Sequence, residues 1–217
     1  MASTRRFDVF VEVPASSLPF GALRAAITAR WVCRWKGDVA RFRLVCRSFS
    51  EDVKDEDQTY ASTPLRAMVR LLAPLSLSLN WRIEFWDVGA AFLHAAVTGE
   101  LYVVPPHELY DQGSVLWKLK KALCRLRMVP RAWQDHLAEL LHTHHFNRTR
   151  SEATVYVNSA LKVTIIIVHV DGLVVCGNKQ AITDIMSTLS KSLLLNRTGD
   201  LATDGVSAVF TGRHSAM

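Results

Sequence analysis

The feature that most constrains this chain is a pair of strand-like runs around a short turn, at residues 163–177 (VTIIIVHVDGLVVCG). Runs rich in Val and Ile flank Asp171-Gly172, and this pattern predicts a β-hairpin whose turn uses the positive φ that glycine accepts freely. The pattern is typical of an ordinary buried hairpin. It also allows a second interpretation, in which the carboxylate of Asp171 lies at a hairpin tip and binds a metal ion.

The remaining patterns predict a mixed α+β fold, with one antiparallel sheet and two or three helices packed against it. Helices are expected from Thr63-Pro64 to Asn80, from Pro130 onward, and over residues 179–194. Pro74 is a misfit in the first helix, because an interior proline costs roughly 3 kcal/mol or forces a kink. Strands are expected at residues 29–34, 40–49, 81–86, 101–104, 115–119, 156–158 and 206–212, with a short edge strand at 7–13.

Charge and cysteine content narrow the class of protein. Lys and Arg number 26 against 20 Asp and Glu, for a net charge of +6, and the excess concentrates in residues 21–50 and 118–131. Either stretch alone is typical of a solvated face, whereas two favour a basic groove for a polyanion. The four cysteines show no C-x-x-C spacing, which predicts free thiols. No signal-peptide core or membrane-length apolar run occurs, so an intracellular protein, cytoplasmic or nuclear, without a membrane partner is expected.

Two carboxylates, Asp87 and Asp171, each follow an apolar strand-like run. A single Asp at a strand end is common, because Asp favours turns. Two of them on neighbouring strands can hold divalent cations about 3.5–4 Å apart for nucleotidyl transfer, and Mg²⁺ prefers carboxylate oxygens. Their separation in the sequence does not show whether they meet in space.

Five blocks of the sequence resemble the reverse-transcriptase domain of copia-type LTR retrotransposons. The blocks occur in the family's order and at family-like separations: ARFRLVCRSFSE, WDVGAAFLHA, WKLKKALCRLRMVPRAW, IIIVHVDGLVVCG and VFTGR. They are similar to the family's KARLVARGF, DVKTAFLNG, KLKKALYGLKQAPRAW, LLVYVDDLLITG and YFLGI segments. Several ordered matches are much more specific than any single one.

The resemblance implies a right-hand polymerase fragment with fingers and a palm whose antiparallel sheet packs on helices. Residues 1–17 would be an N-terminal extension and residues 18–217 the reverse-transcriptase-like domain. The fingers would comprise about 18–80 and 101–129, and the palm about 81–100 and 130–217, with no matching thumb. The implied activity is RNA- or DNA-templated DNA synthesis from deoxynucleotides on a template-primer, with Mg²⁺, or Mn²⁺, as cofactor.

The resemblance also implies roles for single residues. Asp87 matches the family's first catalytic aspartate and Asp171 the first of its paired aspartates, both as metal ligands. The nucleotide-binding positions would be Arg41, Arg43, Ala90, Ala91, Phe92 and Met128. Plainer interpretations stay open: Phe92 also suits a core, and Arg41 and Arg43 suit a half-exposed strand. The histidines at 142, 144 and 145 are more typical of a helix end than of a metal site.

Several positions depart from the family pattern. Gly172 occupies the place of the second paired aspartate, His169 that of a tyrosine, Met128 that of a glutamine and Arg125 that of a glycine. Loss of one catalytic group typically costs about 10²–10³ in rate, so an impaired or inactive polymerase is the leading hypothesis. The alternatives are a working polymerase that uses Asp87 and Asp171 only, a non-catalytic nucleic-acid-binding remnant, and an unstable product.

Overall fold

The computed structural model describes residues 6–47, 61–64, 66–97, 99–109, 114–158, 164–201, 208–210 and 213–215. The chain divides into two compact units, Met1–Tyr60 with Phe92–His136 and Ala61–Ala91 with Leu137–Met217. The expected mixture of strands and helices is confirmed. The expected single sheet is wrong, because the described strands form sheets of five, six and two strands.

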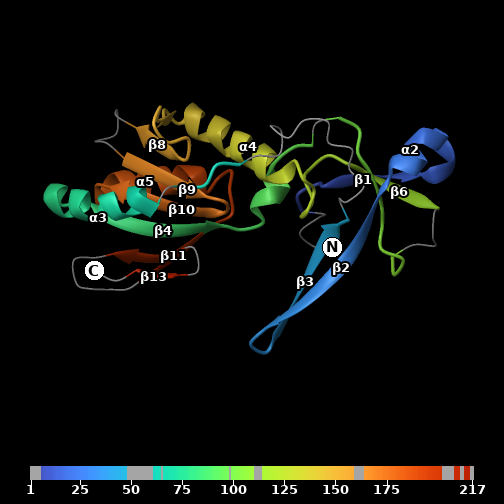
Figure 1. Ribbon diagram of the computed structural model, residues 1–217, viewed down its shortest axis with the longest axis horizontal. Coiled ribbons are helices and arrows are strands. Elements are labelled where there is room, and N and C mark those ends of the chain that lie inside the picture. The colour runs from blue at the N-terminus through green and yellow to red at the C-terminus, as the bar shows by residue number, and fades with distance from the viewer. Residues whose placement is uncertain are drawn as a thin grey trace. The chain divides into compact units, whose positions relative to one another are not determined.

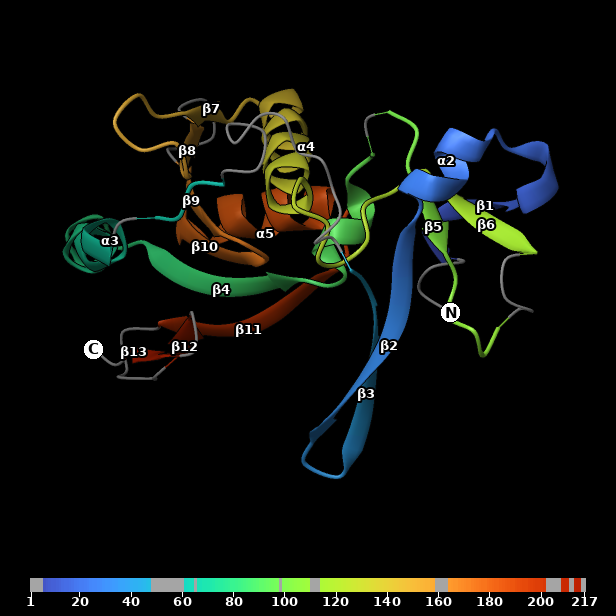
Figure 2. The ribbon, with the colours of Figure 1, turned by 45° about the vertical axis from the view of Figure 1, so that its right-hand side comes forward.

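The first unit is built on a five-stranded sheet of order β1-β6-β5-β2-β3. Its elements are β1 (Phe10–Pro14), η1 (Ala15–Ser17), α2 (Phe20–Ala25), β2 (Ile27–Lys36), β3 (Val39–Cys46), β5 (Tyr102–Val104) and β6 (Val115–Leu119). β1 is an edge strand on β6, as predicted for residues 7–13, and β2 joins β5 in parallel. β2 and β3 form a long antiparallel ribbon that extends beyond the rest of this sheet (Figure 2).

The second unit contains a six-stranded sheet of order β11-β4-β10-β9-β8-β7 (Figure 1). Its strands are β4 (Arg82–Val88), β7 (Asn147–Arg148), β8 (Val155–Asn158), β9 (Thr164–His169), β10 (Gly172–Gly177) and β11 (Leu195–Leu201). The helices of the chain's later part are α3 (Arg66–Leu79), η4 (Ala91–His94), α4 (Val129–Thr143) and α5 (Lys179–Leu189), and α4 crosses the boundary between the units. The described parts of the chain's end form β12 (Ala208–Phe210) and β13 (Arg213–Ser215), inside and just after the strand expected at 206–212.

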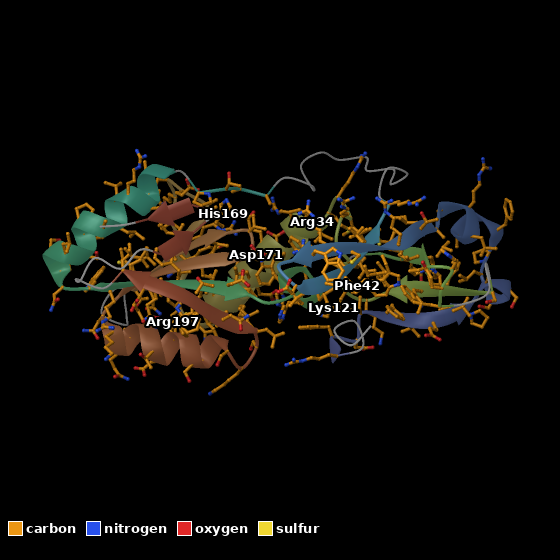
Figure 3. All side chains as sticks on the ribbon, turned by 90° about the horizontal axis from the view of Figure 1, so that it is seen from below. Arg34, Phe42, Lys121, His169, Asp171 and Arg197 are labelled. Carbon is orange, nitrogen blue, oxygen red and sulfur yellow. The ribbon has the colours of Figure 1, made fainter. Side chains whose placement is uncertain are left out.

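Helices α3 and α5 lie on opposite faces of this sheet (Figure 3). Leu72 of α3 packs against Ile83, Phe85, Val174 and Cys176, all of which are buried. Each large apolar side chain buried in this way contributes about 1.5–3 kcal/mol. α5 buries one stripe of residues, as its spacing predicted: Ile182, Ile185, Met186 and Leu189.

Helix α3 ends where the sequence predicts. It continues through Pro74 and ends at Leu79. Asn80 has φ 52°, while Trp81 N–H donates to the Ser76 carbonyl at 2.8 Å, so the predicted left-handed cap is confirmed. Pro74 is therefore accommodated without ending the helix.

Two further predictions concern the cysteines and the membrane. The four cysteines are free, and burial raises the pKa of the Cys176 thiol to about 12, so it stays protonated at neutral pH. None of the helices in the described part of the chain has the length and apolar character needed to cross a membrane.

Candidate catalytic site

The hairpin of β9 and β10 turns at Val170-Asp171, not at Asp171-Gly172. Gly172 is the first residue of β10 and pairs with His169 of β9. The left-handed backbone belongs to Val170, with φ 55°, and Gly172 is not among the described glycines with positive φ. The predicted role of Gly172 as the turn residue is therefore wrong, and the conformation it was expected to adopt falls on a β-branched residue.

Val170 is a strained residue at the tip of this hairpin. A β-branched side chain rarely adopts positive φ, and such a conformation costs on the order of 1–3 kcal/mol. It persists because β9 and β10 hold both ends of the turn in register. Backbone strain of this kind clusters at functional sites, which makes the turn a candidate site on physical grounds.

The pairing of β4 with β10 brings Asp87 to this turn. Asp87 lies directly opposite Gly172, and Val88 N–H donates to the Asp171 carbonyl at 2.8 Å. Asp87 is half-buried, and Asp171, which Figure 3 labels, is exposed. The two carboxylates that the sequence analysis singled out thus lie at adjacent strand ends in one unit.

The electrostatics of this pair favour a bound cation. Burial, and then the nearby charge of Asp171, raise the pKa of Asp87 above its ordinary value. The two side chains supply carboxylate oxygens, the ligand type that hard divalent cations prefer. No group of three or more His, Cys, Asp or Glu residues that could hold a metal occurs in the described ranges. Asp87 and Asp171 therefore offer a hard divalent cation two carboxylates of suitable chemistry, without a third ligand from these residue types in the described ranges.

A row of residues crosses four strands at this end of the sheet. Direct antiparallel partners point to the same face, and the pairing runs from His169 through Gly172 and Asp87 to Asn196. Such partners have Cβ atoms about 4.5–5.5 Å apart. A side chain at position 172 would therefore lie beside Asp87, and glycine leaves that place without one.

The other predicted site residues divide between the units. Ala90 and Ala91 follow Asp87 in the second unit, Ala90 exposed with φ 54° and Ala91 buried. The remaining four belong to the first unit: Arg41 and Arg43 on β3, Phe92 in η4 and Met128 just before α4. Arg43 is exposed, and Phe92 and Met128 are half-buried, whereas the side chain of Arg41 lies outside the described part.

Sequence reasoning missed strand β11, which pairs with β4 on the side away from β10. No strand was expected between residue 194, where the preceding helix was expected to end, and residue 206; that helix in fact ends at Leu189, and β11 begins at Leu195. The strand carries Asn196 opposite Asp87, and Arg197, which forms ion pairs with Glu84 at 3.3 Å and Asp200 at 2.6 Å. Its sequence LNRTGDL lacks the apolar alternation that would have revealed it.

Arg125 stands where the family pattern has a glycine, and its backbone conformation explains why glycine suits this position. Its φ is 74°, and its side chain is exposed. Glycine suits this position because of the left-handed backbone, so the arginine is strained by conformation and not by crowding.

Comparison with solved structures identifies the fold. The chain is similar to apo telomerase from Candida tropicalis, with a TM-score of 0.53, 8% sequence identity and coverage of 98% of this chain and 56% of that one. Telomerase from Candida albicans gives a TM-score of 0.50, also at 8% identity. At this identity the likeness concerns the fold alone.

Sequence comparison gives the family. The model of the reverse transcriptase (RNA-dependent DNA polymerase) family matches residues 16–204, and the chain belongs to that family. It is 27% identical over 194 residues to the retrovirus-related Pol polyprotein from transposon TNT 1-94 of Nicotiana tabacum, covering 84% of this chain. It is 28% identical over 160 residues to that from transposon RE1 of Arabidopsis thaliana, covering 67%.

These relatives confirm the resemblance to copia-type retrotransposon domains. The chain spans 14% and 11% of the length of the two Pol polyproteins.

Replacing Val170 by glycine is expected to stabilise the chain. Glycine removes strain of about 1–3 kcal/mol and loses about 0.5–1 kcal/mol of backbone entropy, for a net gain of about 1 kcal/mol. Urea unfolding followed by circular dichroism measures the change. Val170→Ala, which keeps a Cβ at positive φ, is the matched control, and an equal gain in both variants would contradict the strain argument.

Replacing Asp87 by asparagine is expected to change how stability depends on pH. The raised pKa of Asp87 means that the folded chain holds this proton more tightly than the unfolded chain. The free energy of unfolding therefore falls as the pH rises from about 4 through the raised pKa. Asp87→Asn removes this decrease, so its stability relative to the unaltered chain grows across the same interval. Urea titrations at a series of pH values measure the free energy of unfolding of both proteins. A constant difference between them across this pH interval would contradict the prediction.

Proposed function

We propose that this chain is the catalytic part of a reverse transcriptase, which adds deoxynucleotides to a primer on an RNA or DNA template, and that its activity is impaired. The observation that carries the proposal is the position of Asp87 beside the strained turn that bears Asp171. Membership of the reverse transcriptase family supports the reaction. The position of Gly172 directly opposite Asp87 supports the impairment.

In this proposal the six-stranded sheet is the palm and the five-stranded sheet with its ribbon belongs to the fingers. The predicted boundaries, about 18–80 and 101–129 for the fingers and 81–100 and 130–217 for the palm, remain predictions. The packing of α3 on β4 and β10 favours counting residues 66–79 with the palm.

Asp87 and Asp171 would hold a divalent cation, Mg²⁺ or Mn²⁺. When bound, that cation supplies positive charge to the reacting phosphate and lowers the pKa of the attacking hydroxyl. The backbone N–H groups of Ala90 and Ala91 would donate to the triphosphate, and Phe92 would lie under the sugar. Arg41 and Arg43 would bind phosphate oxygens, for which the guanidinium fork is well suited.

Gly172 weakens this arrangement in a defined way. A carboxylate at position 172 would lie beside Asp87 and add a negative charge that a cation needs to bind tightly. Without it, the two remaining carboxylates compensate less of the cation's charge. Gly172 needs no positive φ, so the backbone accepts an aspartate there without conformational strain.

Primer extension on a defined template tests the proposed function. The unaltered chain is expected to show weak synthesis with Mg²⁺ or Mn²⁺, and Gly172→Asp is expected to raise it by about 10²-fold or more. Asp87→Ala, alone and combined with Gly172→Asp, should abolish it. Thermal melts establish that each variant is folded. The proposal fails if Gly172→Asp is folded and no more active than the unaltered chain, or if synthesis survives Asp87→Ala.

The ribbon of β2 and β3 favours a second candidate function, non-catalytic binding of nucleic acid. Arg34 and Arg41 are direct partners across the ribbon, and like charges in that position destabilise a sheet. A phosphate backbone along this face would remove the repulsion. The pairing puts the four arginine positions on one face together with Lys36 and three valines, and puts only uncharged residues on the other: Arg30, Arg34, Arg41 and Arg43 lie on the first, and Trp31, Cys33, Trp35, Phe42 and Leu44 are among those on the second.

The two basic stretches differ in how far their charges are already neutralised. In the second stretch, three basic side chains form ion pairs: Lys118 with Glu100, Lys120 with Asp8 at 2.7 Å and Arg131 with Asp135 at 2.7 Å. By contrast, the exposed side chains of Arg30, Arg34 and Arg43 form no ion pair within the described ranges. The ribbon, where Figure 3 labels Arg34 and Phe42, is therefore the better candidate surface for a polyanion.

Substituting ribbon arginines is expected to weaken binding to a primer–template duplex and to reduce its dependence on salt. Removing one arginine that binds a phosphate lowers the slope of log affinity against log salt by about one. Fluorescence anisotropy between about 50 and 200 mM salt compares Arg34→Ala with Arg150→Ala, an exposed arginine outside the ribbon with the same change in net charge. Equal effects of the two substitutions would contradict a role for the ribbon.

A further inference from the structure

We propose that Asn196 supplies the oxygen of its carboxamide as a third side-chain ligand for the divalent cation at Asp87 and Asp171. The inference rests on the proposed function, because it concerns the same cation. It assigns a role to a strand that the family motifs do not include. Asn196 would partly replace, from the other side of Asp87, the ligand that Gly172 does not provide.

The position of Asn196 follows from strand pairing. β4 lies between β10 and β11, so Asp87 has two direct partners, Gly172 on one side and Asn196 on the other. Position 172 and Asn196 both lie on the face of the sheet that bears the Asp87 side chain, where directly paired residues other than glycine have Cβ atoms about 4.5–5.5 Å apart. Asn196 and a side chain at position 172 therefore flank Asp87 on the same face of the sheet.

The side chain of Asn196 lies along the end of β4 that carries Asp87. A Cβ built on Gly89 would lie 3.4 Å from the Asn196 Nδ2 atom, so the carboxamide reaches the segment two residues beyond Asp87. Gly89 N–H donates to the Leu194 carbonyl at 2.7 Å, which holds the start of β11 against this segment. The exposed carboxamide forms no hydrogen bond with another described residue, so a ligand would not have to displace a protein partner.

Arg197, the next residue, fixes this arrangement from the opposite face. Its guanidinium group forms ion pairs with Glu84 of β4 at 3.3 Å and with Asp200 at 2.6 Å. Glu84 also accepts a hydrogen bond from the Trp86 indole at 3.1 Å. A register shift between Arg197 and Gly199 lets Asp200 lie opposite Glu84 while Asn196 stays opposite Asp87. Figure 3 labels Arg197 on this strand.

The chemistry of the side chain suits the role. A carboxamide oxygen is a hard, neutral ligand of the kind that Mg²⁺, Mn²⁺ and Ca²⁺ accept beside carboxylates. Being neutral, it adds no repulsion to Asp87, whose pKa is already raised by burial and then by the charge of Asp171. A third oxygen from β11 would place the cation between strands β10, β4 and β11.

Titration of the purified chain with Mn²⁺, followed by electron paramagnetic resonance, tests the inference without requiring catalysis. Asn196→Ala is expected to weaken Mn²⁺ binding by about tenfold or more. Thr198→Ala, an exposed residue of the same strand, should leave it unchanged. Asn196→Asp should bind more tightly than Thr198→Asp, which adds the same charge. Circular dichroism and thermal melts establish that the variants are folded.

The outcomes separate this inference from the proposed function. If Asp87→Ala weakens Mn²⁺ binding while Asn196→Ala stays within twofold of the unaltered chain, the role of Asn196 is overturned and the carboxylate site stands. If Asp87→Ala leaves Mn²⁺ binding unchanged, the carboxylate site itself is overturned, and the role of Asn196 with it.

Discussion

The antiparallel pairing of β4 with β10 is the interaction on which the candidate site depends. It sets Gly172 opposite Asp87 and joins Val88 to Asp171 through a backbone hydrogen bond. One residue of slip in this register would turn Asp87 to the other face of the sheet. The register is fixed by the buried apolar residues further along the same two strands, which pack beneath α3. A hydrophobic core thus holds a pair of like charges at the edge where the sheet meets solvent.

The site combines two destabilising features with an incomplete set of metal ligands. Val170 keeps a strained conformation and Asp87 keeps a raised pKa, and neither feature stabilises the fold. Both are understandable if the turn once served, or still serves, to present carboxylates to a cation. We interpret Gly172 as a change in the ligand set alone, because the backbone around it retains the pairing that a third carboxylate would use.

Local signals in the sequence predicted the elements of this structure well. The left-handed cap at Asn80, the buried stripe of α5 and the ribbon of β2 and β3 depend on neighbouring residues, and each was found from its pattern. The ordered family motifs indicated Asp87 and Asp171, and the structure places both at adjacent strand ends. Nothing in their spacing alone required that outcome.

Predictions from the sequence were wrong where long-range strand pairing overrides the local conformational preference of the residues. Asp171-Gly172 is a strong turn signal, yet the pairing with β4 draws Gly172 into β10 and shifts the turn to Val170. β11 was missed because its polar sequence forms a strand only through its pairing with β4 and the ion pairs of Arg197. The separate five-stranded sheet depends on the long-range pairs of β1 with β6 and of β2 with β5, which no local pattern encodes.

The most direct test of the central claim is anomalous diffraction from crystals of the chain soaked in Mn²⁺. The proposed site predicts one anomalous peak within coordination distance of carboxylate oxygens of both Asp87 and Asp171. The same peak should be absent from crystals of Asp87→Ala. A well-ordered hairpin with no peak between these two side chains, or with their carboxylates directed apart, would contradict it.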